Sequence, residues 1–150
     1  MDLTKEVPRS PKQKMLGIVS LARTIDKARA YNEGKLGEYH YDCPHDKPLF
    51  EFLGTDGATF AAQVKELRTD QNILDWVKAE FMKNKTEADV ERFNDDRSQW
   101  HPDPGSDSEK YFAEMREKLA PGRDIVTWFD LLDLDEKRPV DNPTKLKQRR

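Results

Sequence analysis

The fold is indicated first by residues 10–34, which read SPKQKMLGIVSLARTIDKARAYNEG. Ser10 stands directly before Pro11 and three residues before Gln13, a pattern typical of a helix N-terminus with a capping box. Apolar residues then recur at helical spacing, at Met15, Ile18, Val19, Ala22 and Ile25. Gly34 suits the left-handed conformation in which many helices end. We therefore predict one long helix from about Pro11 to Glu33.

The rest of the chain repeats this helical pattern in shorter segments. Helix start signals lie at Asp46, at Asp56 or Thr55, at Thr69, at Thr86 with Asp89, at Ser106 with Glu109, and at Asp124. Prolines and glycines separate these segments, most clearly in residues 101–105, which read HPDPG. We expect roughly 95 helical residues, far above the one-third helix of an average domain, and no significant sheet.

The predicted fold class is all-α, with one compact domain of about six to seven helices joined by short loops. The domain is expected to span residues 1–134. Residues 135–150 are expected to form a charged C-terminal tail, because Val140 and Leu146 are their only bulky apolar residues. Removal of residues 138–150 should then leave the melting temperature nearly unchanged, since little apolar area is at stake.

Composition excludes several classes of protein. Charged residues make up 37% of the 150 residues and apolar residues 35%, and no apolar run approaches the roughly 20 residues that span a membrane. Cys43 is the only cysteine, which excludes a disulfide scaffold. A sequence pI near 5.7 argues against a dedicated nucleic-acid binder. Because no secretory signal pattern is visible, we expect a soluble, cytoplasmic protein with no nucleic-acid or membrane partner.

Familiar catalytic and cofactor motifs are absent from the sequence. It contains no Walker-type or dinucleotide glycine loop, no Gly-x-Ser-x-Gly, no His-Glu-x-x-His and no EF-hand loop. These absences remove the best-known enzyme classes and leave unfamiliar ones open. We expect no cofactor, and we expect the chain to be helical without any metal.

Residues 38–46, which read EYHYDCPHD, hold the densest group of chemically versatile side chains. His40, Cys43 and His45 would present imidazole and thiolate groups to zinc, but structural zinc sites usually take two separated ligand pairs, so no metal site is predicted. A nucleophilic Cys43 needs a cation beside its sulfur, and the sequence shows none. We favour a turn whose acidic groups bond the local backbone, with Tyr39 or Tyr41 packed on the first helix.

Two charged residues of the first helix lie toward its apolar side. At about 100° per residue, Asp26 and Arg29 fall beside the apolar stripe, whereas Arg23 and Lys27 fall progressively toward solvent. Asp26 and Arg29 are three residues apart and can pair. Burying such a pair requires desolvation, so the pair either fixes the register of the helix or orients Arg29 toward an anionic ligand.

Several short motifs in residues 8–54 resemble one known family. The motifs are Pro8-Arg-Ser-Pro11, Leu21-Ala-Arg-Thr-Ile-Asp-Lys-Ala-Arg-Ala30, Gly34-Lys-Leu-Gly-Glu-Tyr39, Asp42-Cys-Pro44 and Leu53-Gly54. Together they resemble the bacterial family catalogued as domain of unknown function 5069. The resemblance covers the first third of the chain and implies a small, stand-alone protein without an established activity or cofactor. It singles out the same part of the chain as the helical pattern.

The candidate ligand-binding residues are Asp26, Lys27, Arg29, Glu38, Tyr39, Tyr41, Asp42, Cys43 and Asp46. We favour a non-catalytic binding module for a small anionic ligand or a partner protein, in which Arg29 reaches a pocket formed with Tyr39 and Asp42. One alternative is an enzyme with an unfamiliar acid/base site, in which Asp26 or Glu38 is the base. The other is a purely structural or oligomerising protein, which a closed Asp26–Arg29 pair would favour.

Overall fold

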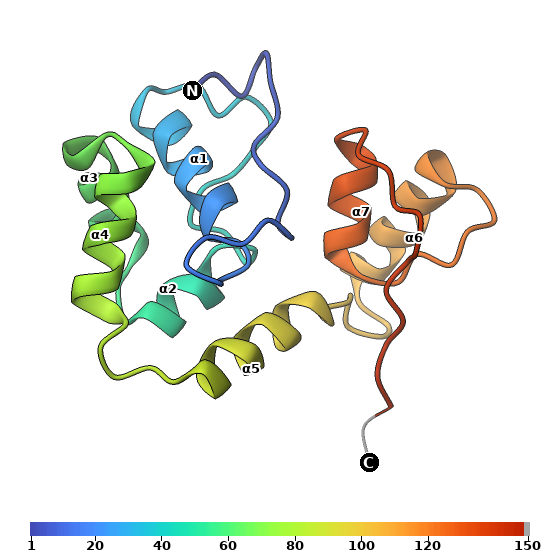
Figure 1. Ribbon diagram of the computed structural model, residues 1–150. Helices are drawn as coiled ribbons and strands as arrows, with labels where there is room; N and C mark the ends of the chain where they lie inside the picture. Colours follow the sequence, from blue (N-terminus) through green and yellow to red (C-terminus); the bar gives the residue numbers. More distant parts are fainter. Residues whose placement is uncertain (149–150) are drawn as a thin grey trace. The chain divides into compact units, whose positions relative to one another are not determined.

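The computed structural model describes residues 1–148, and within this range the regular structure is helical (Figure 1). The helices are α1 (Leu21–Asn32), α2 (Lys47–Leu53), α3 (Gly57–Leu67), α4 (Asp70–Phe81), α5 (Glu87–Ser98), α6 (Asp107–Leu119) and α7 (Trp128–Asp135). The described residues contain no strand, and their only β pairing is an isolated bridge between Met15 and Ile18. The predicted all-α class is confirmed, although helices account for 51% of the described residues, less than we expected.

The first helix begins at Leu21, so the prediction of a start near Pro11 is wrong. Met15 and Ile18 exchange backbone hydrogen bonds of 3.1 and 2.9 Å around Leu16 and Gly17, which have φ of 53° and 73°. Two consecutive positive φ angles make a tight reversal of the chain, and a helix cannot continue through it. The apolar residues of this segment have helical spacing, yet Ile18 belongs to a loop and its side chain is buried there without a helix.

Side-chain caps open four helices where the sequence predicts them, and at the start of α5 Thr86 and Asp89 form the expected reciprocal capping box, with bonds of 3.1 and 2.9 Å. Asp56 accepts a hydrogen bond of 2.8 Å from the backbone N–H of Thr59 at the start of α3, and Thr69 and Ser106 do the same for α4 and α6. Each cap satisfies a backbone donor that the first turn of a helix leaves without a partner. These starts are therefore confirmed.

The last helix starts later than predicted. Its N-cap is Thr127, which accepts from the backbone N–H of Asp130 at 3.3 Å, so the expected cap at Asp124 is wrong. The backbone N–H of Trp128 donates to the carbonyl of Trp100 at 3.0 Å, which satisfies another donor of the first turn. A long-range contact that the local sequence cannot encode thus helps to set this boundary.

The chain divides into two compact units, residues 1–93 and residues 94–150. In the first unit α1 packs against α3, and α3 also packs against α2 and α4 (Figure 1). The rings of Phe50, Phe60 and Trp76 follow one another at centroid separations of 5.3 and 5.9 Å and connect α2, α3 and α4. This packing gives the first unit a continuous core beneath α1.

The second unit has its own apolar cluster, built from Phe112, Ala120, Ile125, Leu131 and Val140. Val140 follows α7 and is only 5% exposed, so the segment after α7 contributes to the core. Four residues later, the backbone N–H of Thr144 donates to the Asp130 carboxylate at 2.7 Å, which attaches the same segment to α7. The domain bounds 1–134 and 135–150 stay a prediction, and residues 149–150 of the expected tail lie outside the described range.

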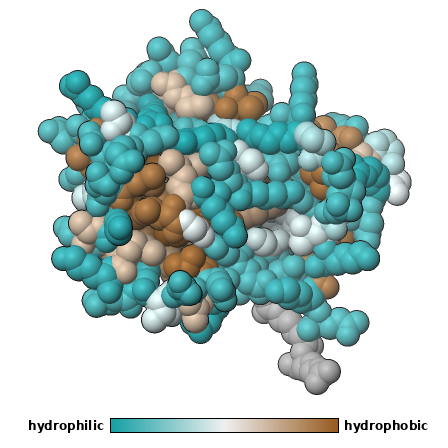
Figure 2. Space-filling view, viewed as in Figure 1, coloured by the Kyte–Doolittle hydropathy of each residue, from teal (hydrophilic) through white to brown (hydrophobic). Residues whose placement is uncertain are grey.

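The molecular surface is strongly polar. The face in Figure 2 is largely hydrophilic, with an apolar area on its left side, in keeping with a chain of which 37% of residues are charged. Within the described range, no helix combines the length and the apolar character needed to cross a membrane.

Candidate functional site

Helix α1 is enclosed on nearly all sides. Nine of its twelve residues are buried, and they include Arg23, Asp26 and Lys27 at 5%, 3% and 3% exposure. The expectation that Arg23 and Lys27 point toward solvent is therefore wrong. The irregular segments before and after α1 cover its charged flank: Arg9 bonds to Asp26 from one side and Asp46 bonds to Lys27 from the other. A helical wheel assumes one solvent side, which this helix lacks.

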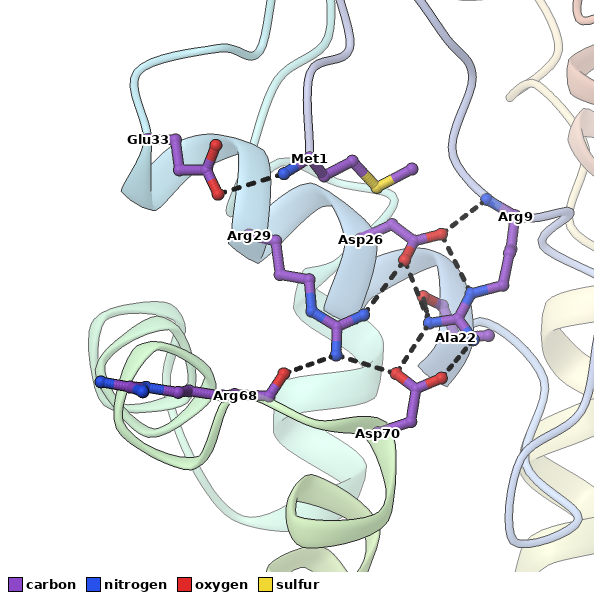
Figure 3. Close-up of polar contacts among 8 residues, drawn as sticks. All are labelled: Met1, Arg9, Ala22, Asp26, Arg29, Glu33, Arg68 and Asp70. Carbon is purple, nitrogen blue, oxygen red and sulfur yellow. Dashed lines mark hydrogen bonds and ion pairs between the residues drawn. The ribbon is translucent and has the colours of Figure 1, made fainter.

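Asp26 is held chiefly by Arg9, a residue 17 positions earlier in the chain (Figure 3). The guanidinium of Arg9 donates from Nε to Asp26 Oδ2 at 3.0 Å and from Nη2 to Asp26 Oδ1 at 3.0 Å. The backbone N–H of Arg9 adds a third bond of 2.9 Å to Oδ2. Two parallel bonds of this kind give an arginine–carboxylate pair directional strength, so Asp26 locks the N-terminal segment onto α1.

Asp70, in the first turn of α4, joins Arg9 to Arg29. Arg9 Nη1 donates to Asp70 Oδ2 at 2.9 Å, and Arg29 Nη2 lies 2.9 Å from Asp70 Oδ1 (Figure 3). Hydrogen bonds from Arg9 are the main cause of a lowered pKa at the Asp70 carboxyl. The predicted pair of Asp26 and Arg29 is present at 3.6 Å, as one edge of a four-residue network.

Sequence reasoning found two members of this network and missed the other two. Asp26 and Arg29 share a helix, so their spacing reveals the pair. Arg9 and Asp70 reach it from distant segments, and only Arg9 left a signal, as part of the motif Pro8-Arg-Ser-Pro11.

Arg29 also fixes an unusual turn after α3. Its Nη2 donates to the backbone carbonyl of Arg68 at 2.9 Å. Arg68 has φ 67° and ψ −61°, and the N–H of Thr69 bonds the carbonyl of Leu67 at 2.8 Å across it. This three-residue γ-turn with positive φ is rare and strained for a residue with a β-carbon. Backbone strain of this kind persists only where the surroundings impose it, and it is frequent at binding sites.

A pocket of about 250 Å³ opens beside this turn, and it is lined by Arg29, Asn32, Glu33, Val64, Lys65 and Arg68. Val64 is only 1% exposed and supplies apolar surface. Asn32 is anchored by a hydrogen bond of 2.9 Å from its Nδ2 to the carbonyl of Ala61. Glu33 is engaged by the amino group of Met1 at 3.1 Å (Figure 3). The pocket therefore carries three cationic side chains and a carboxylate that is already paired.

A second polar group of α1 joins Lys27 to residues 43–46. Lys27 Nζ lies 2.8 and 2.9 Å from the two carboxylate oxygens of Asp46, and both side chains are at most 4% exposed. The sulfur of Cys43 lies 3.6 Å from Lys27 Nζ and 3.6 Å from Asp46 Oδ2. Lys27 thus supplies a cation beside Cys43, which the sequence did not reveal, but the carboxylate of Asp46 neutralises this charge. The ion pair of Lys27 and Asp46 joins residues 43–46 to α1.

The remaining predicted site residues lie apart from the pocket lining. Tyr39 lies beneath the guanidinium of Arg23, whose Cζ is 5.8 Å from the ring centroid. Tyr41 donates its hydroxyl hydrogen to the carbonyl of Gly57 at 2.7 Å, and burial raises the pKa of this phenol. Asp42 pairs with Lys47 at 3.0 Å, and Glu38 is exposed. The structure therefore brings Arg29 to a pocket with residues of α3, without Tyr39 or Asp42 in its lining.

One protein family matches most of the chain. The family described as "Domain of unknown function (DUF5069)" matches residues 5–138. The chain belongs to the DUF5069 family. A comparison with curated proteins found no match. The DUF5069 match includes every residue of the Arg9 network and of the pocket beside Arg68.

The chemistry available to this DUF5069 chain follows from the charges around the pocket. Arg9 and Arg29 balance Asp26 and Asp70, so the four-residue network is close to neutral. Lys65 and Arg68 are exposed and supply the excess positive charge. Within residues 1–148, no three His, Cys, Asp or Glu side chains gather in a way that would hold a metal ion. The site is thus equipped to attract and orient an anion.

Proposed function

We propose that this chain is a non-catalytic binding module that holds a small anionic ligand in the pocket between α1 and α3. The observation that carries the proposal is the gathering of Arg29, Lys65 and Arg68 around one pocket of about 250 Å³. Guanidinium groups match the geometry of carboxylates and phosphates, and ammonium groups add a point charge.

The roles of the three cations differ. Arg29 is oriented by its bonds to Asp70 and to the carbonyl of Arg68, so it presents a fixed edge to the pocket. A side chain that is already ordered loses less entropy when a ligand arrives, which strengthens binding. Lys65 and Arg68 are exposed, and they supply the net attraction.

The size of the pocket favours a small ligand. Its volume lies below the roughly 300–1,000 Å³ of pockets that enclose drug-sized molecules, so a phosphate or carboxylate with few attached atoms fits better than a partner segment. Binding is favoured over acid/base catalysis because both oxygens of Asp26 already accept from Arg9. We extend the proposal to a cytoplasmic location, because a single cysteine suits a reducing compartment.

The test is a titration of the full chain with inorganic phosphate at constant ionic strength, followed by ¹H–¹⁵N NMR. We expect shifts at the backbone amides of Asn32, Lys65 and Arg68. Lys65→Gln and Arg68→Gln should each weaken binding by about tenfold, the loss of one charge-assisted contact. Lys78→Gln serves as the matched control, since Lys78 is an exposed lysine of α4 outside the pocket lining.

Two results would contradict the proposal. One is the absence of saturable shifts at millimolar phosphate. The other is an equal weakening in Lys78→Gln, which would mean that the anion responds to overall charge and to no particular pocket.

A further inference from the structure

A larger pocket lies in the second unit. It has a volume of about 390 Å³, and its lining comes from the loop that follows α5, from α6, and from the segments before and after α7. Phe112 and Val126 provide apolar surface, and Glu109 and Arg116 provide opposite charges. The rings of Phe112 and Trp128 make a T-shaped contact at a centroid separation of 5.0 Å, which helps to fix the position of Phe112.

The charges on α6 are ordered along the pocket. Glu109, Phe112 and Arg116 are spaced at i, i+3 and i+7 and therefore share one face of the helix. Seven residues of α-helix extend for roughly 10 Å, which separates the negative end of this face from the positive end. The Glu109 carboxylate accepts from the backbone N–H of Gly105 at 3.1 Å, so it stays at the N-terminal end. A ligand carboxylate is repelled at this end and attracted to Arg116.

The guanidinium of Arg116 is anchored to the backbone of the segment before α7. Its Nη1 donates to the carbonyl of Ile125 at 3.4 Å, and its side chain is 30% exposed. Arg116 Nε pairs with Glu117 at 3.7 Å, and the side chain of Glu117 is 62% exposed, a geometry in which ion pairs are weak. Because the pair with Glu117 is weak, Arg116 can still form a strong ion pair with a ligand anion that is shielded from water in the pocket.

Leu146, in the segment after α7, also lines the pocket. Gln99 holds the backbone on both sides of Leu146: Gln99 Nε2 donates to the carbonyl of Lys145 at 3.1 Å, and Lys147 N–H donates to Gln99 Oε1 at 2.7 Å. Leu146 is nevertheless 41% exposed. A leucine that is fixed in place with much of its surface in water gains free energy when an apolar ligand covers it.

We propose that this pocket binds an amphipathic carboxylate, with its apolar body between Phe112 and Leu146 and its carboxylate on Arg116. The ligand class follows from the lining, which has apolar side chains in the middle, cationic Arg116 at one end and anionic Glu109 at the other. A medium-length fatty acid has this chemistry and approaches the length of the α6 face.

The experiment is isothermal titration calorimetry of the full chain with octanoate, octanamide and acetate. Octanoate should bind with a negative heat-capacity change, the mark of buried apolar surface. Octanamide keeps the apolar body and lacks the charge, so it should bind about tenfold more weakly. Acetate lacks the apolar body and should show no saturable binding at the same concentrations.

Variants assign the two halves of the ligand to their contacts. Arg116→Gln should weaken octanoate to the level of octanamide and leave octanamide unchanged, and Leu146→Ser should weaken both. Lys118→Gln is the matched control, because Lys118 is an exposed cation on α6 outside the pocket lining. Equal binding of octanoate and octanamide by the unaltered chain would overturn the proposal, as would unchanged octanoate binding in Arg116→Gln. The first comparison needs no variant, so it stands even where a substitution impairs folding.

Discussion

Arg9 forms a two-point ion pair with Asp26 across 17 residues of chain, with both nitrogen–oxygen distances at 3.0 Å. The side chain of Asp26 is 5% exposed, and that of Arg9 is 25% exposed. The pair fastens the irregular segment before α1 to the helix at the centre of the first unit. It also orients the second arginine, Arg29, through the shared carboxylate of Asp70.

Arg9→Met should destabilise the chain strongly, because it leaves the buried carboxylate of Asp26 with only Arg29 at 3.6 Å, whereas Asp26→Leu should cost less because Arg9 keeps its hydrogen bonds to Asp70. Losing one partner of a buried pair costs about 3–5 kcal/mol in the free energy of unfolding. Urea denaturation of Asp26→Leu, Arg9→Met and the double variant measures the coupling, which should be at least about 1 kcal/mol. The coupling of Asp26 with Arg29→Met should be smaller, since that contact is 3.6 Å. Strictly additive effects for Arg9 and Asp26 would contradict the observed pairing.

Asp70 should make the stability depend on acid pH. Because Arg9 lowers the pKa of Asp70 in the folded state, the stabilisation is present above the unfolded carboxyl pKa of about 3.9 and is lost as the pH falls through the folded pKa. The free energy of unfolding should therefore fall more steeply below about pH 4 in the unaltered chain than in Asp70→Asn. Asp96→Asn, at an exposed position of α5, is the control and should keep the steep dependence. Parallel pH profiles of the free energy of unfolding for all three proteins would show that Arg9 does not lower the pKa of Asp70.

Arg68→Gly should stabilise the chain while it weakens the anion pocket. Glycine adopts positive φ without the strain that a β-carbon imposes, so the gain should be about 1 kcal/mol. Arg68→Ala is the matched control: it removes the same cation but keeps the β-carbon, so phosphate binding should fall without a gain in stability. Thermal denaturation and phosphate titration of the two variants separate these effects. A loss of stability in Arg68→Gly would show that the turn is not strained.

Val140→Ala should lower the melting temperature, in contrast to the small effect expected from sequence for the whole tail. Val140 is 5% exposed and belongs to the cluster of the second unit. Removing two buried methyl groups costs about 1–2 kcal/mol, or roughly 2–8 °C for a chain of this size. Val7→Ala is the control, because Val7 is 43% exposed and its truncation removes little buried area. Differential scanning calorimetry of both variants measures the two melting temperatures. Equal values would contradict a role of Val140 in the core and would favour the interpretation of residues 138–150 as a dispensable tail.

The sequence by itself determined the features that depend on neighbours in the chain. The caps at Asp56, Thr69 and Ser106 were predictable because each bonds a backbone N–H only three residues away. The pair of Asp26 and Arg29 was predictable for the same reason, since helical spacing alone brings residues three apart together. The all-α class follows from many such local signals that agree with one another.

Tertiary structure alone decided what surrounds α1. Lys27 was expected to face solvent, and it is buried because Asp46 reaches it from a loop 19 residues later. Arg29 meets Lys65 and Arg68 in a pocket because α3 packs against α1. Such contacts depend on where the chain returns, and loops of similar local sequence allow many return paths. Only the combined packing of all segments selects one path, so the pocket and its partners lie beyond what residue spacing can reveal.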